Sequence, residues 1–525
     1  MAIISLPFLV GALTLSWLAI RFRNLGHRPK GYPPGPPTLP IIGNIHQIPK
    51  TKIHVQFEKW AKEYGPVFSL VLGANVVIVL SSDMAVNDLL EKRSAIYSSR
   101  PSFYLSQQIG SGGMRWTLME YGERWRKLRK VGHSALNINT SQNYVPYQDL
   151  ESVQMLAGFL DKPADFIAHI ERTTMSLITQ VIFGFRTHTL DHEYTKQVFK
   201  NVHLIGKLAH SAAIVDNFPF LKNLPNVMLP ARQLAQDHFK NEKEFLVNVW
   251  KRAKEAVKAG GGNPCLADEL YKAQQIEKWD DSIAAYACIT IQEAAADTST
   301  VSILNFIKAM ILHPEVQRRG QEEVDQAFGD SLPSLDDAIN LPYVQACVKE
   351  TLRWLPATPL SLPHCVTQDD EYLGYNIPKG ATVIANVWGL HRDADRYPDP
   401  AVFDPTRFSG SKGLASESYD STKRDHYGFG FGRRVCPGQH IAERTVLFSV
   451  SRLLWAFNFN KAVDDFGNEI LPPRDTFADG VVAVPPPFKA NITCRSAERA
   501  KAIWQAWAEC EQLLDKDFQW KTGRK

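Results

Sequence analysis

The chain has 525 residues, of which 44% are hydrophobic and 22% charged, a composition typical of a globular protein with a large core. The net charge of only +4 gives no reason to expect a nucleic-acid-binding protein. The seven cysteines are scattered without a Cys-x-x-Cys pair, so we expect a reducing compartment, no disulfide framework and no zinc site.

Residues 1–20 are predicted to form a transmembrane anchor. No charged side chain occurs from Ile3 to Ile20, and a helix of that length spans roughly 27 Å, close to the thickness of the bilayer core. By the positive-inside rule, the basic residues that follow stay in the cytosol and the N-terminus faces the lumen. A cleaved signal peptide is the alternative, but no basic residue precedes the apolar run. Residues 21–37 are interpreted as a basic, Pro-rich hinge before a main domain over residues 38–525.

Few strands and many helices are predicted along this domain. Aliphatic residues on both sides of a Gly-Ala-Asn turn predict strands over Val67–Leu72 and Val76–Leu80. The glycine-rich run 260–264 is interpreted as a flexible loop between two helical segments. The other predicted elements are helices over Asp281–His313, over Tyr343–Leu355 and after Ala497, and strand-like stretches at Tyr372–Ile377 and Thr382–Asn386. The pattern alone predicts a mainly α protein with small β-sheets.

Asp297 and Thr298 are polar residues within the apolar helix predicted over Asp281–His313. Three alanines precede them, and residues this small let a helix backbone pass close to a flat ligand. A purely structural interpretation also exists, in which Thr298 donates to a carbonyl one turn earlier and Asp297 faces solvent.

Glu350 and Arg353 stand three residues apart on the next predicted helix, so they share one face and can form an ion pair. That spacing is common on helix surfaces and has no diagnostic value by itself. It gains meaning from its order, because it precedes the segment Phe403–Phe408, which contains Arg407, and then the segment around Cys436.

Cys436 lies in Phe429–Gly438, where three glycines let the backbone turn tightly and approach a flat or bulky group. Arg433 and Arg434 place positive charge beside the sulfur, and a helical period begins soon afterwards, so the thiolate is favoured over the thiol. A buried anionic sulfur requires a strong partner, for which a metal ion is the obvious candidate. A buried structural cysteine is the alternative.

This segment resembles the haem-binding loop of the cytochromes P-450, whose pattern is Phe-x-x-Gly-x-Arg-x-Cys-x-Gly. Phe429, Gly432, Arg434, Cys436 and Gly438 occupy every fixed position. The resemblance implies the cytochrome P-450 fold and haem b as the cofactor, with Cys436 as the axial iron ligand. It also implies that Phe429 shields the sulfur, that Arg434 contacts a haem propionate, and that Gly438 belongs to the haem-binding loop.

The same resemblance gives roles to the other motifs. Trp125 and Arg129 match Trp-x-x-x-Arg and would contact the haem propionates, as would His364. Asp297 and Thr298 would hold dioxygen and deliver protons. The remaining residues, which would form a buried structural network, are Glu350, Arg353 and Arg407.

The family's activity is monooxygenation, so we expect one oxygen atom from O2 to be inserted into an apolar small molecule, in fungal secondary metabolism. Electrons would come from NADPH through a flavoprotein reductase, docked by basic residues such as Arg126, Lys127, Lys130 and Arg433. The expected location is the endoplasmic reticulum membrane, with one span and a cytosolic catalytic domain. The alternatives are a haem-thiolate isomerase or dehydratase, against which the Asp-Thr pair argues, and a non-catalytic haem or small-molecule binder.

The resemblance also places the walls of the substrate pocket in five stretches of the chain, namely residues 102–118, about 204–221, 286–290, 357–362 and 477–482. The apolar residues expected there are Phe103, Tyr104, Ile109, Met114, Phe218, Phe220, Leu360 and Phe477.

Overall fold

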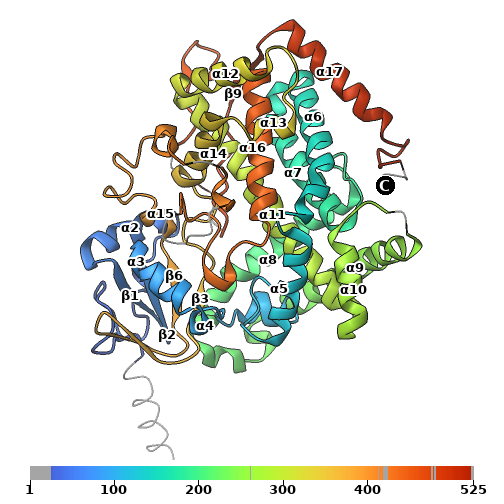
Figure 1. Cartoon of the computed structure of the whole chain (residues 1–525). Coiled ribbons are helices and arrows are strands. Elements are labelled where there is room, and N and C mark those ends of the chain that lie inside the picture. The colour runs from blue at the N-terminus through green and yellow to red at the C-terminus, as the bar shows by residue number, and fades with distance from the viewer. Residues whose placement is uncertain are drawn as a thin grey trace, which may run out of the picture.

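The computed structural model describes residues 25–260, 262–411, 413–417, 424–474, 477 and 481–521, without the side chains of residues 210–213 (Figure 1). The predicted anchor over residues 1–20 and the first part of the hinge lie outside the described residues. Within the part that is described, every helix is too short or too polar to cross a bilayer.

Helices make up most of the described chain, and Figure 1 shows them covering the larger part of the molecule beside a smaller region of sheet. Their bounds are α2 (Ile53–Tyr64), α3 (Asp83–Val86), α4 (Ser94–Tyr97), α5 (Glu123–Leu136), α6 (Val145–Asp161), α7 (Phe166–Phe183), α8 (Glu193–Asn217), α9 (Pro230–Ala259), α10 (Leu266–Glu277), α11 (Asp281–Leu312), α12 (Pro314–Phe328), α13 (Leu335–Ala338), α14 (Pro342–Trp354), α15 (Val387–Leu390), α16 (Gln439–Ala456) and α17 (Ala497–Gln512).

The strands form three small sheets. The largest has the order β1-β2-β6-β3, in which β2 and β6 are parallel and the other pairs antiparallel. The second is the β4–β5 hairpin, and the third has the order β8-β7-β9. The strand bounds are β1 (Val67–Leu72), β2 (Asn75–Leu80), β3 (His364–Cys365), β4 (Asp370–Tyr372), β5 (Tyr375–Ile377), β6 (Thr382–Ala385), β7 (Phe457–Val463), β8 (Glu469–Ile470) and β9 (Ala490–Cys494).

The predicted helices are confirmed to within about one residue at each end, because proline and capping residues mark their limits. Asp280 starts α11 by accepting hydrogen bonds from the N–H groups of Ser282 and Ile283, and Pro314 follows its end. One strand prediction is confirmed only in part, for Tyr372 at the end of β4 and Tyr375–Ile377 in β5. The stretch Tyr372–Ile377 is part of a hairpin, which turns at Leu373 and Gly374, both with positive φ.

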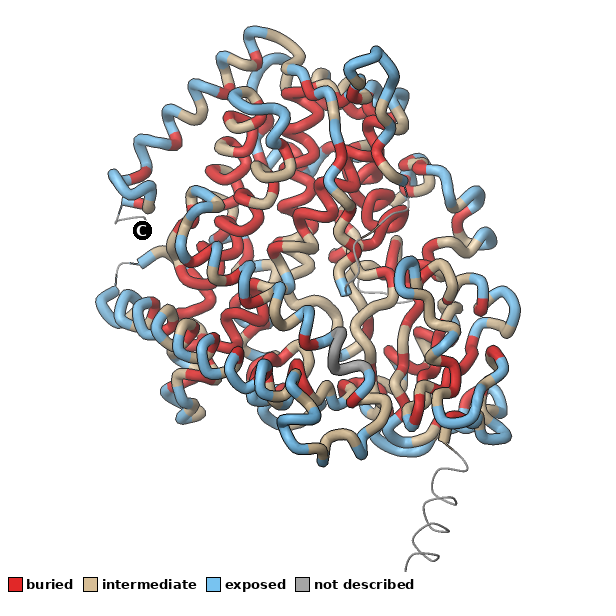
Figure 2. Tube along the Cα trace, turned by 180° about the vertical axis from the view of Figure 1, so that it is seen from behind, coloured by how far each residue is buried: buried red, intermediate tan, exposed pale blue. Residues whose placement is uncertain are grey.

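The long helix α11 runs through the core and packs against α7, α9, α14 and α16. Most of its residues are buried, as expected for a helix that is apolar on nearly every side. Figure 2 shows the buried residues gathered in the inner helices and the exposed residues on the outer ones. This arrangement puts the small residues of α11 opposite the segment that contains Cys436.

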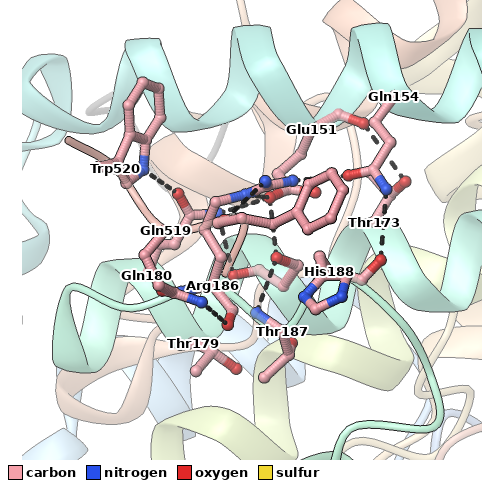
Figure 3. Close-up of polar contacts among 12 residues, drawn as sticks. Glu151, Gln154, Thr173, Thr179, Gln180, Arg186, Thr187, His188, Gln519 and Trp520 are labelled. Atoms are coloured by element: carbon pink, nitrogen blue, oxygen red, sulfur yellow. Dashed lines mark hydrogen bonds and ion pairs between the residues drawn. The ribbon is translucent and has the colours of Figure 1, made fainter. Parts of the chain in front are cut away.

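The C-terminal tail docks against α6 and α7, as Figure 3 shows. Trp520 donates its indole N–H to Gln180 Oε1 at 2.6 Å, and the Gln519 side chain exchanges two hydrogen bonds with the backbone of Arg186. The guanidinium of Arg186 in turn pairs with the buried Glu151 of α6 at 2.7 Å. The tail beyond the predicted final helix therefore has a packing role.

Candidate active site

The loop around Cys436 folds back on itself. The Cys436 N–H donates to the Phe429 carbonyl at 2.8 Å, and the turn between them passes through Gly430 and Gly432 with φ of +76° and +53°. A Cβ on Gly432 would stand 2.1 Å from the Leu90 carbonyl oxygen. Glycine is therefore required at this position both by backbone conformation and by space.

Two opposing effects act on the Cys436 thiol. Burial raises its pKa, while a hydrogen bond from a backbone N–H and the positive charge of Arg129 lower it. The sequence predicts that Arg433 and Arg434 supply the favourable charge. The structure corrects this, because Arg433 points to solvent and the cation that favours the thiolate is Arg129, one helix away on α5.

A cluster of cations lies at one edge of the cavity that Cys436 lines. Burial lowers the pKa of Arg434 to about 8 and that of Arg100 to about 9, and it also lowers the pKa of Arg129. Their positive charges repel one another, and among the described residues none of the three forms an ion pair with a carboxylate. Buried cations without a counter-charge call for an anionic ligand.

Sequence reasoning missed Arg100. Its guanidinium donates to the carbonyls of Leu362 and Pro363 at 2.7 Å, more than two hundred positions along the chain. Nothing local distinguishes it from a surface arginine. His364 lies beside it on β3, with its ring hydrogen-bonded to the Tyr97 carbonyl, and burial together with Arg100 lowers the pKa of that imidazole to about 3.

The cavity also leaves space at Gly438. This glycine has an ordinary φ of −97°, and a Cβ built on it meets no protein atom within 4 Å. A side chain here would project into space that the protein leaves open. Of the predicted site residues, those that line this one cavity are Trp125, Arg129, Thr298, His364, Phe429, Arg434, Cys436 and Gly438.

Thr298 and Asp297 do not share the same surroundings. Thr298 lines the cavity and donates to the Ala294 carbonyl one turn earlier, at 2.8 Å. Asp297 lies beside it on α11, outside the cavity lining and partly buried. Burial and the negative charge of Glu293 raise the pKa of Asp297, so its carboxyl keeps a proton to higher pH than an exposed aspartate does.

The predicted ion-pair network lies away from the cavity, on α14. Arg353 donates two hydrogen bonds to Glu350, at 2.6 and 2.7 Å, and both side chains are fully buried. Arg407 approaches Glu350 at 3.6 Å, which is an ion pair without a hydrogen bond. Arg353 also donates to the carbonyls of His391 and Pro400, so it joins α14 to two later loops.

The site thus combines a buried thiol, a cation cluster without a counter-charge, and a facing helix of small residues, which fits a flat anionic cofactor such as haem. The Cytochrome P-450 family model matches residues 33–492. This chain belongs to the cytochrome P-450 family. Family members bind haem through an axial cysteine thiolate, and haem is accordingly the cofactor of this P-450.

Two similar proteins that align with nearly the whole chain are named cytochrome P-450 monooxygenases. The chain is 47% identical to cytochrome P-450 monooxygenase virE of Hypocrea virens, covering 98% of this chain and 95% of that protein. It is 45% identical to fogE of Aspergillus ruber, covering 98% and 96%. A zebra fish cytochrome P-450 solved with abiraterone shares the fold at a TM-score of 0.67 and 22% identity, covering 84% of this chain and all of that one. This P-450 is therefore a monooxygenase-class enzyme.

The predicted aromatic walls of the pocket are not found at this cavity. Trp116 and Thr117 line it from the loop before α5, so the predicted stretch 102–118 reaches the cavity, but with other residues than Phe103 and Tyr104. The predicted stretches 286–290 and 357–362 also contribute lining residues, among them Thr290 and Ala357. The predicted residues pack elsewhere: the Tyr104 ring lies 5.2 Å from Lys222 Nζ, and Phe220 is 51% exposed. The other predicted residues outside this lining are Ile109, Met114, Phe218, Leu360 and Phe477.

Proposed function

We propose that this P-450 inserts one oxygen atom from O2 into an apolar small molecule of fungal secondary metabolism, with Cys436 as the axial ligand of the haem iron. The observation that carries the proposal is a single cavity that Cys436, Thr298 and the cations Arg100, Arg129 and Arg434 all line. When bound, haem supplies the activation of O2, which a thiolate ligand favours.

Arg100, Arg129 and Arg434 are the residues that would hold the carboxylates of the haem. Each of these cations is poorly compensated by the protein alone, so binding two carboxylates relieves both their desolvation and their mutual repulsion. The indole of Trp125 closes the same edge, and His364 adds a neutral hydrogen-bonding ring. Glu350, Arg353 and Arg407 fix the loops behind the cysteine segment.

Protons reach the cavity through Asp297 and Thr298. The Thr298 hydroxyl, now bonded to the Ala294 carbonyl, faces the cavity and can turn its proton toward a ligand there. Asp297 is the neighbouring acid, with a carboxyl that stays protonated to higher pH than usual. In this short relay, Asp297 passes a proton to the Thr298 hydroxyl, and Thr298 passes a proton into the cavity.

The substrate is a small apolar molecule with few polar groups. The cavity wall formed by α11 and the segment after α14 consists mainly of small and aliphatic residues, including Ile291, Ala295, Ala357 and Leu362. The hydroxyls of Thr290, Thr298, Ser299, Ser302, Thr358 and Ser361 also belong to this wall and can orient polar substituents. The relatives named above are fungal monooxygenases, which supports a secondary metabolite as substrate.

The electron donor is an NADPH-dependent flavoprotein reductase. The guanidinium carbons of Arg126 and Arg433 lie 5.9 and 5.3 Å from the centre of the Tyr121 ring, and both arginines are exposed beside the cysteine loop. An acidic partner would be steered to this surface. The apolar N-terminus supports a location in the endoplasmic reticulum membrane, with the catalytic domain in the cytosol.

The test is NADPH consumption with reductase and a panel of apolar fungal metabolites, followed by mass spectrometry in 18O2. The proposal predicts a product heavier by one labelled oxygen atom and dependent on both reductase and NADPH. Turnover of a peroxide without reductase would instead indicate an isomerase or dehydratase. Haem binding without any turnover across the panel would indicate a non-catalytic binder.

A further inference from the structure

Most hydroxyl groups of the cavity wall already donate to the protein backbone. Those of Thr290, Thr298 and Ser302 donate to the carbonyl one turn earlier on α11, at 2.6, 2.8 and 2.9 Å. Thr174 on α7 and Thr445 on α16 do the same. A hydroxyl has one proton, so each of these groups can accept a hydrogen bond from a ligand but donates to a ligand only by giving up its own bond.

Three hydroxyls of the wall have no hydrogen-bond partner among the residues that the structure describes, and they belong to Thr117, Ser299 and Thr358. Ser299 is only 8% exposed. Thr117 lies next to the cation cluster, because Arg100 Nε donates to the Thr117 carbonyl at 3.1 Å. Thr358 is partly exposed and follows the apolar Ala357 on the segment after α14. Of the three donors, Thr358 is therefore the best placed to meet an apolar ligand.

The backbone on both sides of Thr358 is fixed by hydrogen bonds from distant parts of the chain. The Ala483 N–H donates to the Ala357 carbonyl, and the Trp388 N–H donates to the Pro359 carbonyl, both at 2.8 Å. The Thr358 side chain is therefore carried by a segment that is held at the residue before it and at the residue after it. A donor on such a rigid segment loses little conformational freedom when it binds a ligand.

Ser361 fixes the turn that follows Thr358. Its N–H donates to the Thr358 carbonyl at 3.2 Å, and its φ of +53° lies in the left-handed region, which a serine rarely adopts. The Ser361 Oγ accepts the Ala385 N–H of β6 at 3.2 Å, which holds the residue in this conformation. Backbone strain of this kind persists only where the surrounding structure imposes it, and it is frequent at ligand sites.

We propose that Thr358 is a specificity-determining residue that donates a hydrogen bond to an acceptor oxygen of the substrate. The substrate is then an apolar molecule that carries a carbonyl or ether oxygen, and a pure hydrocarbon of the same shape is bound less well. The aliphatic side chains of the same wall, such as Ile291, Ala295 and Leu362, offer no donor to that oxygen. This inference rests on the proposed function and names the chemical class of its substrate.

The experiment measures the binding of matched probes to the full-length holoenzyme, from the change in haem absorption on titration. The probes are three pairs that differ by a carbonyl oxygen: tetralin and 1-tetralone, 2-ethylnaphthalene and 2-acetylnaphthalene, and diphenylmethane and benzophenone. Thr358→Val removes the hydroxyl and keeps the shape of the side chain. We expect the Kd of at least one ketone to rise about 3- to 10-fold in this variant, while the Kd of its hydrocarbon partner changes less than about 2-fold.

Further variants separate the hydroxyl of Thr358 from the shape of the wall and from the other free donors. Thr358→Ser keeps a hydroxyl and should retain the affinity for the ketone. Thr117→Val and Ser299→Ala remove the other two unpaired hydroxyls and should leave the difference between ketone and hydrocarbon unchanged. Selective loss of the ketone in either of these two variants, and not in Thr358→Val, would overturn the assignment. Equal weakening of ketone and hydrocarbon in Thr358→Val would also overturn it, because only packing would then have changed.

A second measurement reports the hydrogen bond itself and needs neither reductase nor turnover. Hydrogen bonding lowers the stretching frequency of a carbonyl, which infrared difference spectroscopy detects in a ketone labelled with 13C at that carbon. The bound ketone should absorb at lower frequency in the unaltered enzyme and in Thr358→Ser than in Thr358→Val. An identical frequency in all three would refute the role of Thr358 and leave the proposed function intact. If no probe of any pair altered the haem absorption, the proposed apolar substrate would itself be refuted.

Discussion

The guanidinium carbon of Arg434 lies 4.1 Å from the centre of the Trp125 indole ring. Arg434 also donates to the carbonyls of Ser98 and Met119, at 2.7 and 2.6 Å. The cysteine loop, helix α5 and the segments that precede α5 therefore meet at one buried cation. Because that cation has no acidic partner among the described residues, the meeting point is suited to a carboxylate from the cofactor.

Replacing Arg434 with leucine is expected to weaken haem retention. A charge-assisted hydrogen bond contributes about 1.5–3 kcal/mol, so the rate of haem transfer to excess apomyoglobin should increase about 10- to 100-fold. Arg433→Leu is the matched control, because this neighbouring arginine is exposed and, within the described part of the chain, its side chain donates only to the Tyr121 hydroxyl. Equal haem loss from both variants would contradict the assignment of Arg434.

Replacing Arg353 with leucine is expected to destabilise the fold strongly, because Glu350 would be left buried with its main counter-charge gone. The free energy of unfolding should fall by roughly 3–5 kcal/mol. It is measured by unfolding the protein in guanidinium chloride and following the circular dichroism signal. Arg318→Ala is the control, since Arg318 and Glu322 form an exposed helix pair and the change should stay within about 0.5 kcal/mol. Similar costs in both variants would remove the special role of the buried pair.

The sequence predicted those features of the site that depend on local spacing. Five fixed residues around Cys436 identify the loop, and Pro314 shows where α11 must end. Features that depend on tertiary contacts could not be predicted from the sequence. Arg100 is held at the cavity by hydrogen bonds to the carbonyls of residues 362 and 363, which are far away in the sequence. Leu373 adopts a positive φ, which is not expected for a leucine.

The residues of the cavity walls were mispredicted for the same physical reason, because they depend on tertiary contacts. The sequence locates the stretches that can approach the cofactor, but not the direction in which each side chain points. The ring of Tyr104 lies against Lys222 and Arg232, and the residues of the same stretch that line the cavity are Trp116 and Thr117. The anchor predicted over residues 1–20 stays a prediction.

Thr298→Ala is expected to keep the haem but to waste electrons. Without the hydroxyl at the cavity, the last step of proton delivery fails, and the fraction of NADPH electrons that leaves as hydrogen peroxide should rise several-fold. Thr300→Ala is the control, because Thr300 makes the same type of bond to a carbonyl one turn earlier but faces Thr174 of α7. Tight coupling in Thr298→Ala would exclude this residue from the relay.

Acid should destabilise the enzyme partly through His426. Burial lowers the pKa of this imidazole to about 4, against about 6.5 when unfolded, so the folded state favours the neutral ring. Its contribution to stability is present above about pH 6.5 and is lost as pH falls towards 4, at up to about 1.4 kcal/mol per pH unit. Denaturant midpoints measured across this range test the slope.

His426→Asn isolates that effect. The asparagine Oδ1 can still accept the Gly428 N–H that His426 Nδ1 accepts at 3.1 Å, but it does not titrate. We expect the slope of the unfolding free energy against pH, between pH 6.5 and 4, to become less steep. The decrease should correspond to about one proton fewer taken up on unfolding. His46→Asn, at an exposed position, should leave the slope unchanged. A slope that is the same in His426→Asn as in the unaltered enzyme would show that His426 has no part in it.

The bond between Cys436 and the haem iron is the central claim, and the absorption spectrum of the reduced, carbon-monoxide-bound enzyme measures it directly. The unaltered enzyme should give the red-shifted band of a thiolate-ligated ferrous haem, and Cys436→Ala should lose that band. Replacing Cys365 with alanine, a second partly exposed cysteine, should preserve it. The same band in Cys436→Ala as in the unaltered enzyme would contradict the account.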